Sequence, residues 1–327
     1  ARSRAIGLWG GAGGIAAAVG PVLGGVLVSW IGWRAVFWVN IPIIAVACRL
    51  TLRSLPAPAA RHGRAIDPLG QILSVLGLAA LTYGMITGGE SGLGSASAAA
   101  ICCGAAVLAG LVVVEHHVDD PMLPMPLFRE ARFTVSALAG LALNISFFGQ
   151  LFVLALFLQR YLGYEPWLAG LALAPQACSA VVASPMGGRM TARIGAFPAM
   201  LTGLLTGAAG FAGLALATAS TPYPLVAALT FLGGFGTALT MPAATSAAVA
   251  SASAGYTGVA GSVVNAARQT GSVVGVAVFG SLIASGDFLT GFHRAVVGAS
   301  AVFAVAAIPV AVVILRAASR PERVDAP

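Results

Sequence analysis

Residues 10–25, GGAGGIAAAVGPVLGG, lie within an uncharged run that covers positions 5–33. About 20 apolar residues in a helix cross a bilayer, so this run is long enough to span one. Each glycine disfavours a helix in water by roughly 1 kcal/mol relative to alanine, whereas in lipid small residues let helix backbones pack closely. Gly20 and Gly24 are four apart, which predicts a smooth packing face, and Pro21 predicts a kink. The stretch therefore predicts a kinked, glycine-faced membrane helix.

The composition of the whole chain agrees with this first helix. The 327 residues are 58% hydrophobic and only 8% charged, whereas soluble domains carry about 25% charged residues. We therefore expect an all-α integral membrane protein in a lipid bilayer. The net charge of +7 comes from 17 arginines and no lysine. A nucleic-acid-binding protein would cluster these arginines on one face, and their spacing along this chain argues against a nucleic-acid partner.

Charged and turn-forming segments separate ten expected spans. These fall near 5–30, 35–54, 68–88, 96–114, 133–158, 166–187, 197–218, 224–249, 260–284 and 296–316. The uncharged stretch 194–267 must hold more than one span. We expect turns in it at 220–222 and at 251–255, where serine, threonine, proline and glycine gather.

The arginines also predict an orientation, because short cytoplasmic loops carry an excess of them. One set of connections and ends carries thirteen arginines: Arg2, Arg4, Arg49, Arg53, Arg61, Arg64, Arg129, Arg132, Arg189, Arg193, Arg316, Arg320 and Arg323. The alternate set carries Arg34, Arg160 and Arg294. This asymmetry predicts a multi-pass protein of the plasma membrane with both ends of the chain in the cytoplasm.

Metal and redox chemistry have weak support in the sequence. His116, His117, Asp119 and Asp120 lie together in the connector 115–132, but adjacent histidines cannot easily share one ion in a fixed geometry. We interpret this segment as a solvated connector, and we expect no metal site, no cofactor and no disulfide framework. The four cysteines all lie in apolar runs: Cys48, Cys102, Cys103 and Cys178.

The opening stretch resembles a known motif. Gly13, the pair Gly20-Pro21 and the pair Gly24-Gly25 resemble the antiporter motif in the fifth helix of drug exporters of the major facilitator superfamily. A generic glycine-zipper packing face is the alternative interpretation. The resemblance implies that four helices precede this segment in the family.

Later segments resemble the fourteen-helix drug:proton antiporters of that superfamily. Residues 67–70 (DPLG), 124–128 (PMPLF) and 260–282 (AGSVVNAARQTGSVVGVAVFGSL) carry this likeness. It implies six parts: 1–54, the last two helices of an N-terminal half; 55–67, a cytoplasmic linker; 68–114, an extra helix pair; 115–132, a cytoplasmic connector; 133–316, a six-helix C-terminal half; and 317–327, a cytoplasmic tail.

A cytoplasmic loop is expected to carry a gate. Gly188, Arg189, Arg193 and Gly195 resemble the superfamily's loop motif Gly-x-x-x-Asp-Arg-x-Gly, with Ala192 in place of the aspartate. Arginines near helix ends can bind the carbonyl dipoles there and stabilise one gate state. Simple anchoring of the loop in the cytoplasm is the alternative.

Arg268 is the one charge that we place well inside a span. An intramembrane arginine is costly and marks a functional site by default, where it would hold a proton-linked partner or an anionic group. Snorkelling to the interface is the alternative. Asn265 and Gln269 are four residues apart and share a face near Arg268.

A second group of residues suggests a substrate cavity. Asn144, Phe147, Phe148, Gln150 and Gln176 combine aromatic rings with a few polar groups, which is typical of ligand sites. Interhelical hydrogen bonds are an equally good interpretation of the polar members.

These features together predict a transporter and not an enzyme. We expect proton-coupled efflux of a small hydrophobic or amphipathic drug or metabolite by alternating access. No aspartate or glutamate lies mid-span, although proton coupling needs a group that titrates in the membrane. A truncated, non-transporting remnant or a membrane scaffold is the alternative.

Overall fold

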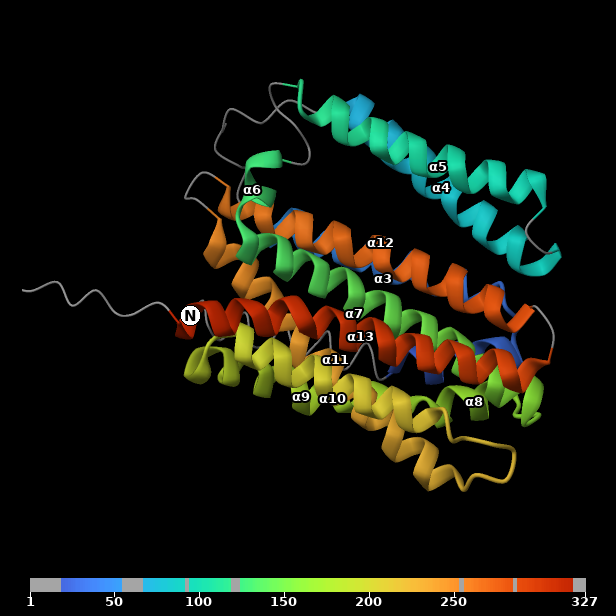
Figure 1. Cartoon of the computed structure of the whole chain (residues 1–327). Coiled ribbons are helices and arrows are strands. Elements are labelled where there is room, and N and C mark those ends of the chain that lie inside the picture. The colour runs from blue at the N-terminus through green and yellow to red at the C-terminus, as the bar shows by residue number, and fades with distance from the viewer. Residues whose placement is uncertain are drawn as a thin grey trace, which may run out of the picture.

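The computed structural model describes residues 19–54, 67–91, 94–118, 124–252, 256–284 and 287–319. Every regular element in these ranges is a helix. Nine helical segments of the described residues are long and apolar enough to cross a membrane. The predicted class is confirmed: the chain is an all-α, multi-pass membrane protein (Figure 1).

The first third of the chain forms a loose group of helices. A short apolar helix covers Val19–Trp30, and the elements that follow are α2 (Ala35–Trp38), α3 (Asn40–Ser54), α4 (Pro68–Ser91) and α5 (Ser95–Glu115). No residue of α3 is buried. Helices α4 and α5 pack on each other, and α4 also contacts α12. Figure 1 shows this pair along one edge of the bundle.

The remaining helices form the packed bundle. Its elements are α6 (Met125–Arg129), α7 (Ala131–Leu156), the π-helical turn η1 (Phe157–Tyr161), α8 (Pro166–Ala172), α9 (Ala174–Ile194), α10 (Ala196–Leu214), α11 (Tyr223–Ser251), α12 (Thr257–Ala284) and α13 (Phe288–Ala318). The largest buried cluster joins α7, α10, α11 and α13. The rings of Phe157 and Phe292 stack in it with their centroids 4.4 Å apart.

Close backbone contact joins α7 to α12. A Cβ at Gly271 would lie 3.2 Å from the Ile145 amide nitrogen, and one at Gly275 would lie 2.8 Å from the Ile145 Cα. Such contacts leave no space for a side chain, so the two backbones approach as closely as a helix pair allows. Gly271 and Gly275 are four residues apart, like Gly20 and Gly24. Both lie in the interface with α7.

Nine of the ten expected spans match helical segments of the described residues, with corrections at their ends, while residues 5–18 of the first expected span lie outside the described residues. The turns at 220–222 and after Ser251 separate α10, α11 and α12 as predicted, although 253–255 lie outside the described residues. Three expected limits differ from the helix ends by four residues or more. Helix α10 ends at Leu214 and not 218. Helix α9 continues to Ile194 and not 187, because the turn needs only Gly195, whose φ of 94° favours glycine. Helix α13 begins at Phe288 and not 296.

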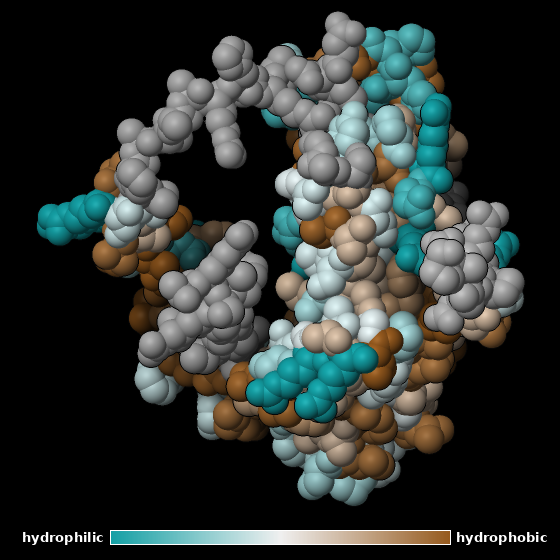
Figure 2. Space-filling model, turned by 90° about the vertical axis from the view of Figure 1, so that its left-hand side faces the viewer, coloured by the Kyte–Doolittle hydropathy of each residue, from teal (hydrophilic) through white to brown (hydrophobic). Residues whose placement is uncertain are grey.

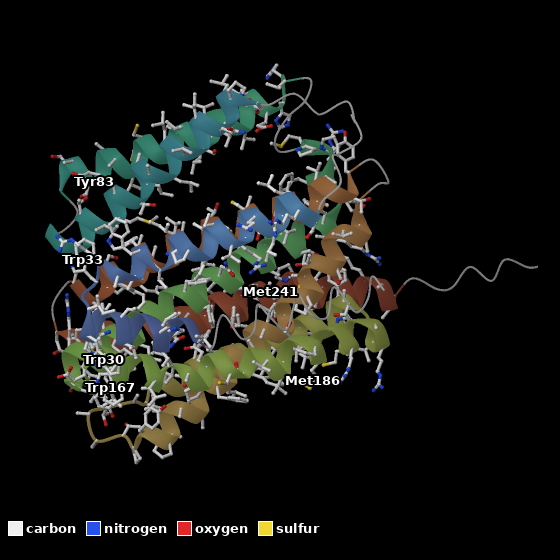
Figure 3. The ribbon with its side chains drawn as sticks, turned by 180° about the vertical axis from the view of Figure 1, so that it is seen from behind. Trp30, Trp33, Tyr83, Trp167, Met186 and Met241 are labelled. Atoms are coloured by element: carbon white, nitrogen blue, oxygen red, sulfur yellow. The ribbon has the colours of Figure 1, made fainter. Side chains whose placement is uncertain are left out.

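The two ends of the bundle differ in character. Figure 3 shows Trp30, Trp33, Tyr83 and Trp167 gathered at one end. Tryptophan and tyrosine are enriched where a membrane meets water, so these rings mark one interface. Figure 1 places the start of α7 and the end of α13 at the opposite end. Figure 2 looks at that opposite end and shows hydrophilic residues there.

Asp287 caps α13 at its first turn. Its carboxylate accepts hydrogen bonds of 2.9 Å from the Thr290 amide and the Thr290 hydroxyl. These bonds, the amide bond first, hold the pKa of Asp287 below its ordinary value, with a smaller contribution from His293. A lowered native pKa means that the cap stabilises the fold fully above the unfolded pKa, and that this contribution disappears as pH falls through the native pKa.

We therefore expect Asp287→Ala to lower the thermal unfolding temperature of the detergent-solubilised protein at pH 7. The difference from wild type should shrink below about pH 4, where the carboxylate takes up a proton. Asp287→Asn is the matched control, since asparagine also caps helices and does not titrate. A difference between wild type and Asp287→Ala that is the same at every pH would contradict this role.

Candidate transport pathway and helix contacts

The helix Val19–Trp30, whose sequence resembles the antiporter motif, packs against α8. A Cβ at Gly25 would lie against the Pro166 carbonyl oxygen and 2.9 Å from the Trp167 Cα. From the other side, a Cβ at Gly170 would lie 2.9 Å from the Pro21 carbonyl carbon. The Trp167 amide also donates a hydrogen bond of 3.2 Å to the Ser29 hydroxyl. We call this contact between helix Val19–Trp30 and α8 the glycine contact.

The described residues show a contact on only part of the predicted packing face of this helix. Among them, nothing lies within 4 Å of a Cβ at Gly20 or Gly24, so the groove expected of this pair stays a prediction. Gly25 and Pro21 make the contact instead, because the helix turns that side toward α8. Gly13 lies outside the described residues. Gly170, which is not among the predicted motif residues, is the partner that completes the contact.

A chain of polar groups crosses from α7 to α12. The Asn144 side-chain amide, on a residue that is 1% exposed, donates to the Ser272 hydroxyl at 2.9 Å. The Ser272 hydroxyl donates in turn to the Arg268 carbonyl oxygen at 3.3 Å. Asn144 therefore forms an interhelical hydrogen bond. Such a bond was the alternative to a place in the substrate cavity.

Arg268 lies where α12 crosses a notch in α7. A Cβ at Gly140 would lie 3.1 Å from the Arg268 Cγ, so Gly140 leaves room for the arginine stem. Arg268 is half-buried, and its Nε is fully buried with no hydrogen-bond partner among the described residues. It is the twelfth residue of α12, about 16 Å from the start of that helix at 1.5 Å per residue.

The predicted cavity residues divide into two sets. Gln150 and Gln176 are 0% and 2% exposed, and the Gln176 Nε2 donates to the Gln150 Oε1 at 2.8 Å between α7 and α9. Their second amide groups are buried without partners among the described residues. This pair therefore lies inside the helix packing and does not line an open surface.

The second set remains accessible. Phe148 is 37% exposed and meets Phe147 edge to face, with ring centroids 5.2 Å apart. Asn265 and Gln269 are exposed on α12 on either side of Arg268. These side chains, together with Arg268, are the predicted cavity residues that are not buried among the described residues.

The predicted gating loop is largely helical. Gly188, Arg189 and Arg193 lie in the last turns of α9, and only Gly195 forms the turn to α10. Both arginines are exposed, and neither forms an ion pair within the described residues. The neighbouring Gly187, which the motif does not include, makes the close contact: a Cβ there would lie 3.0 Å from the Leu239 Cα of α11.

In the connector after α5, the structure describes His116 and His117 but only part of the predicted acidic cluster. The Nδ1 atoms of His116 and His117 lie 2.8 Å from the carbonyl oxygens of Val112 and Val113. Asp119 and Asp120 lie outside the described residues. All four cysteines are free thiols, exposed on the outside of their helices.

Two buried carboxylates were not expected from the sequence. Asp67 and Glu115 are 9% and 2% exposed at adjoining ends of α4 and α5. The Gly70 amide donates to the Asp67 Oδ1 at 2.8 Å, and the Glu115 Oε1 lies 2.9 Å from the position of a Gly70 Cβ. The sequence feature that could have identified Asp67 as the cap of α4 is its position directly before Pro68. A capping residue is common before a proline that begins a helix.

Comparison with known proteins identifies the family. The family model described as Major Facilitator Superfamily matches residues 1–276 and again 134–327. An all-helical membrane bundle with close glycine contacts fits that assignment, and the chain belongs to the major facilitator superfamily.

Within this superfamily, the chain is similar to three bacterial resistance or export proteins. The chain is 36% identical to the methylenomycin A resistance protein of Streptomyces coelicolor, over 87% of this chain and 60% of the relative. It is 32% identical to the multidrug resistance protein Stp of Mycobacterium tuberculosis, over 87% and 53%. It is 31% identical to the tetracenomycin C resistance and export protein of Streptomyces glaucescens, over 86% and 53%. The chain thus spans just over half the length of these relatives.

The glycine contact generates a test of helix packing. We expect Gly170→Leu to lower the free energy of unfolding by about 1–3 kcal/mol, because overpacking forces the helices apart. Gly24→Leu is the matched control in the same contact region, with open space at its Cβ. Thermal unfolding in detergent measures both. If both variants lower the stability equally, the glycine contact is not more sensitive to a large side chain than the open position Gly24.

Proposed function

We propose that the protein exports small hydrophobic or amphipathic molecules by alternating access, driven by protons. The observation that carries this proposal is the glycine contact, which joins helix Val19–Trp30 to α8 without intervening side chains. Two helices that touch through bare backbone can separate and close again with little side-chain rearrangement. The superfamily assignment and the resistance and export names of three relatives support the same function.

The glycine contact would close one side of the pathway. Trp30 and Trp167 lie at the same end of the bundle as this contact (Figure 3), so the contact is near one membrane interface. Arg189 and Arg193 lie at the end of α9, where their charges favour the carbonyl dipoles of helix C-termini. In this proposal Gly188, Arg189, Arg193 and Gly195 form the opposite gate.

The exposed aromatic and polar residues would line the pathway between these gates. Phe147 and Phe148 offer apolar contact area, and Asn265 and Gln269 offer hydrogen bonds at the flank of Arg268. Gln150, Gln176 and Asn144 would support the lining residues from behind through interhelical bonds.

Proton coupling is a further part of the proposal. The carboxylates of the described residues lie at or beside helix ends, and a titrating group within the membrane would therefore come from elsewhere in the full-length protein. The superfamily assignment supports a proton-binding group that lies in another part of the full-length protein than the described helices.

We expect bacteria that lack their own major efflux pumps to accumulate less dye when they express the whole coding sequence in which this chain lies. Ethidium, N-phenylnaphthylamine and anilinonaphthalene sulfonate form a panel of cationic, neutral and anionic probes. A protonophore should restore accumulation if protons drive export. Unchanged accumulation of all three dyes would contradict the transport function and favour a non-transporting remnant or scaffold.

We also propose that this is a plasma-membrane protein with both ends of the chain in the cytoplasm. Arg189, Arg193 and Arg316 lie in the last turns of α9 and α13, where the excess of positive charge favours the cytoplasmic side. The aromatic rings at the other end would then face the outer interface.

Labelling of single cysteines tests this orientation. In a variant whose four native cysteines are replaced by serine, we expect a membrane-impermeant maleimide to label Glu165→Cys in intact cells. It should label Arg193→Cys only after permeabilisation, because these exposed positions lie at opposite ends of helices α8 and α9. The reverse pattern would invert the proposed topology.

A further inference from the structure

Arg268 is a cation that the described helices position but do not neutralise. Its guanidinium forms no ion pair or hydrogen bond with a described residue, and its Nε is buried. The carboxylates in the described ranges lie at helix ends, beyond the reach of this mid-helix position. Holding an arginine in a span without a counter-charge is costly, so a bound negative group would relieve that cost.

Residues of α7 and α12 hold the Arg268 side chain in its position. Gly140 leaves space on α7 for the arginine stem, whose Cγ and Cδ lie against it. The hydrogen bond from Asn144 to Ser272 ties α7 to α12 one turn further along, and Ser272 bonds the Arg268 carbonyl oxygen within α12. An arginine whose stem is held in place loses less freedom on binding than a fully mobile one.

Two amide side chains flank this cation. Asn265 and Gln269 lie three residues before and one residue after Arg268, and both are exposed. Their amides can donate hydrogen bonds to the same group that the guanidinium binds. A planar guanidinium matches carboxylate and sulfonate oxygens with two parallel hydrogen bonds. The chemistry of the three side chains therefore fits an anionic head group.

An apolar surface lies at a suitable distance. Phe147 and Phe148 are seven and eight residues beyond Gly140 on α7, which is about 12 Å along a helix. Positions seven or eight apart lie on the same side of a helix, and Phe148 is 37% exposed. A molecule with an anionic head at Arg268 can place an aromatic or aliphatic body of that length along these rings.

We propose that Arg268, with Asn265 and Gln269, is an anion-recognition site that selects amphipathic substrates with a carboxylate or sulfonate head and an apolar body. This proposal rests on the proposed export function and specifies its substrate class. Phe147 and Phe148 hold the apolar body in this arrangement, while the arginine supplies the selectivity for charge.

Two dyes with one ring system test the site. Anilinonaphthalene sulfonate carries a sulfonate, and N-phenylnaphthylamine has the same rings without it. We expect the purified full-length protein in lipid nanodiscs to bind the sulfonate dye more tightly, as measured by fluorescence titration against empty nanodiscs. Arg268→Gln should weaken sulfonate binding by about tenfold or more, the usual effect of losing a charged hydrogen bond, and leave binding of the neutral dye unchanged.

Two further variants make the result interpretable. Arg268→Lys keeps the charge and loses the paired geometry, so it should give an intermediate affinity for the sulfonate dye. Arg316→Gln removes an exposed arginine at the end of α13 and should change neither dye. If Arg268→Gln does not fold, the dye preference of the wild type and the Arg268→Lys result decide the question.

The outcomes separate this inference from the export function. Equal affinity of the wild type for both dyes, or equal weakening of both by Arg268→Gln, would overturn the anion site. Such a binding result would overturn the anion site even if cells still export ethidium. Export of ethidium would then show that the transport function is intact. Arg268 paired with a carboxylate from another part of the full-length protein would give that same loss of preference and would also overturn the proposal.

Discussion

Close contact between helix backbones is the constraint on which this structure depends. In lipid the hydrophobic effect does not drive helices together, so packing must come from van der Waals contact and hydrogen bonds. Gly275 against Ile145, and Gly170 against Pro21, show contacts in which any side chain would collide with a neighbouring backbone. The bundle therefore depends on glycine at positions where a water-soluble protein would bury leucine or valine.

The membrane also dictates where charge can lie. The carboxylates and most arginines of the described residues occupy helix ends, where most of these side chains are exposed to water, although Asp67 and Glu115 are buried there. Arg268 is the exception, and the structure accommodates it with the Gly140 notch and leaves its Nε unpartnered. Buried amides elsewhere, such as Gln150 and Gln176, pair with each other across helices. Among the described residues, Arg268 is thus the mid-helix charge for which we propose a bound anionic group.

Much of the fold was predictable from the sequence because lipid imposes simple rules. Span lengths, the turns around α10 and α11, and the all-helical class follow from hydropathy and charge. Helix ends were less certain: α9 continues past Arg189 and Arg193 because a single glycine, Gly195, suffices for the turn. Which glycines make contact was not predicted in full. Gly271 and Gly275 pack against α7, whereas nothing among the described residues lies against Gly20 or Gly24.

The sequence by itself determined that the chain is a helical membrane protein and where its spans lie, since these depend on local composition. The tertiary structure alone decided which face of each helix meets a neighbour. It turned Gly25 toward Gly170, placed Asn144 opposite Ser272, and buried Asp67 beside Glu115. Such pairings depend on the rotation and register of helices distant in the sequence, which no local pattern specifies.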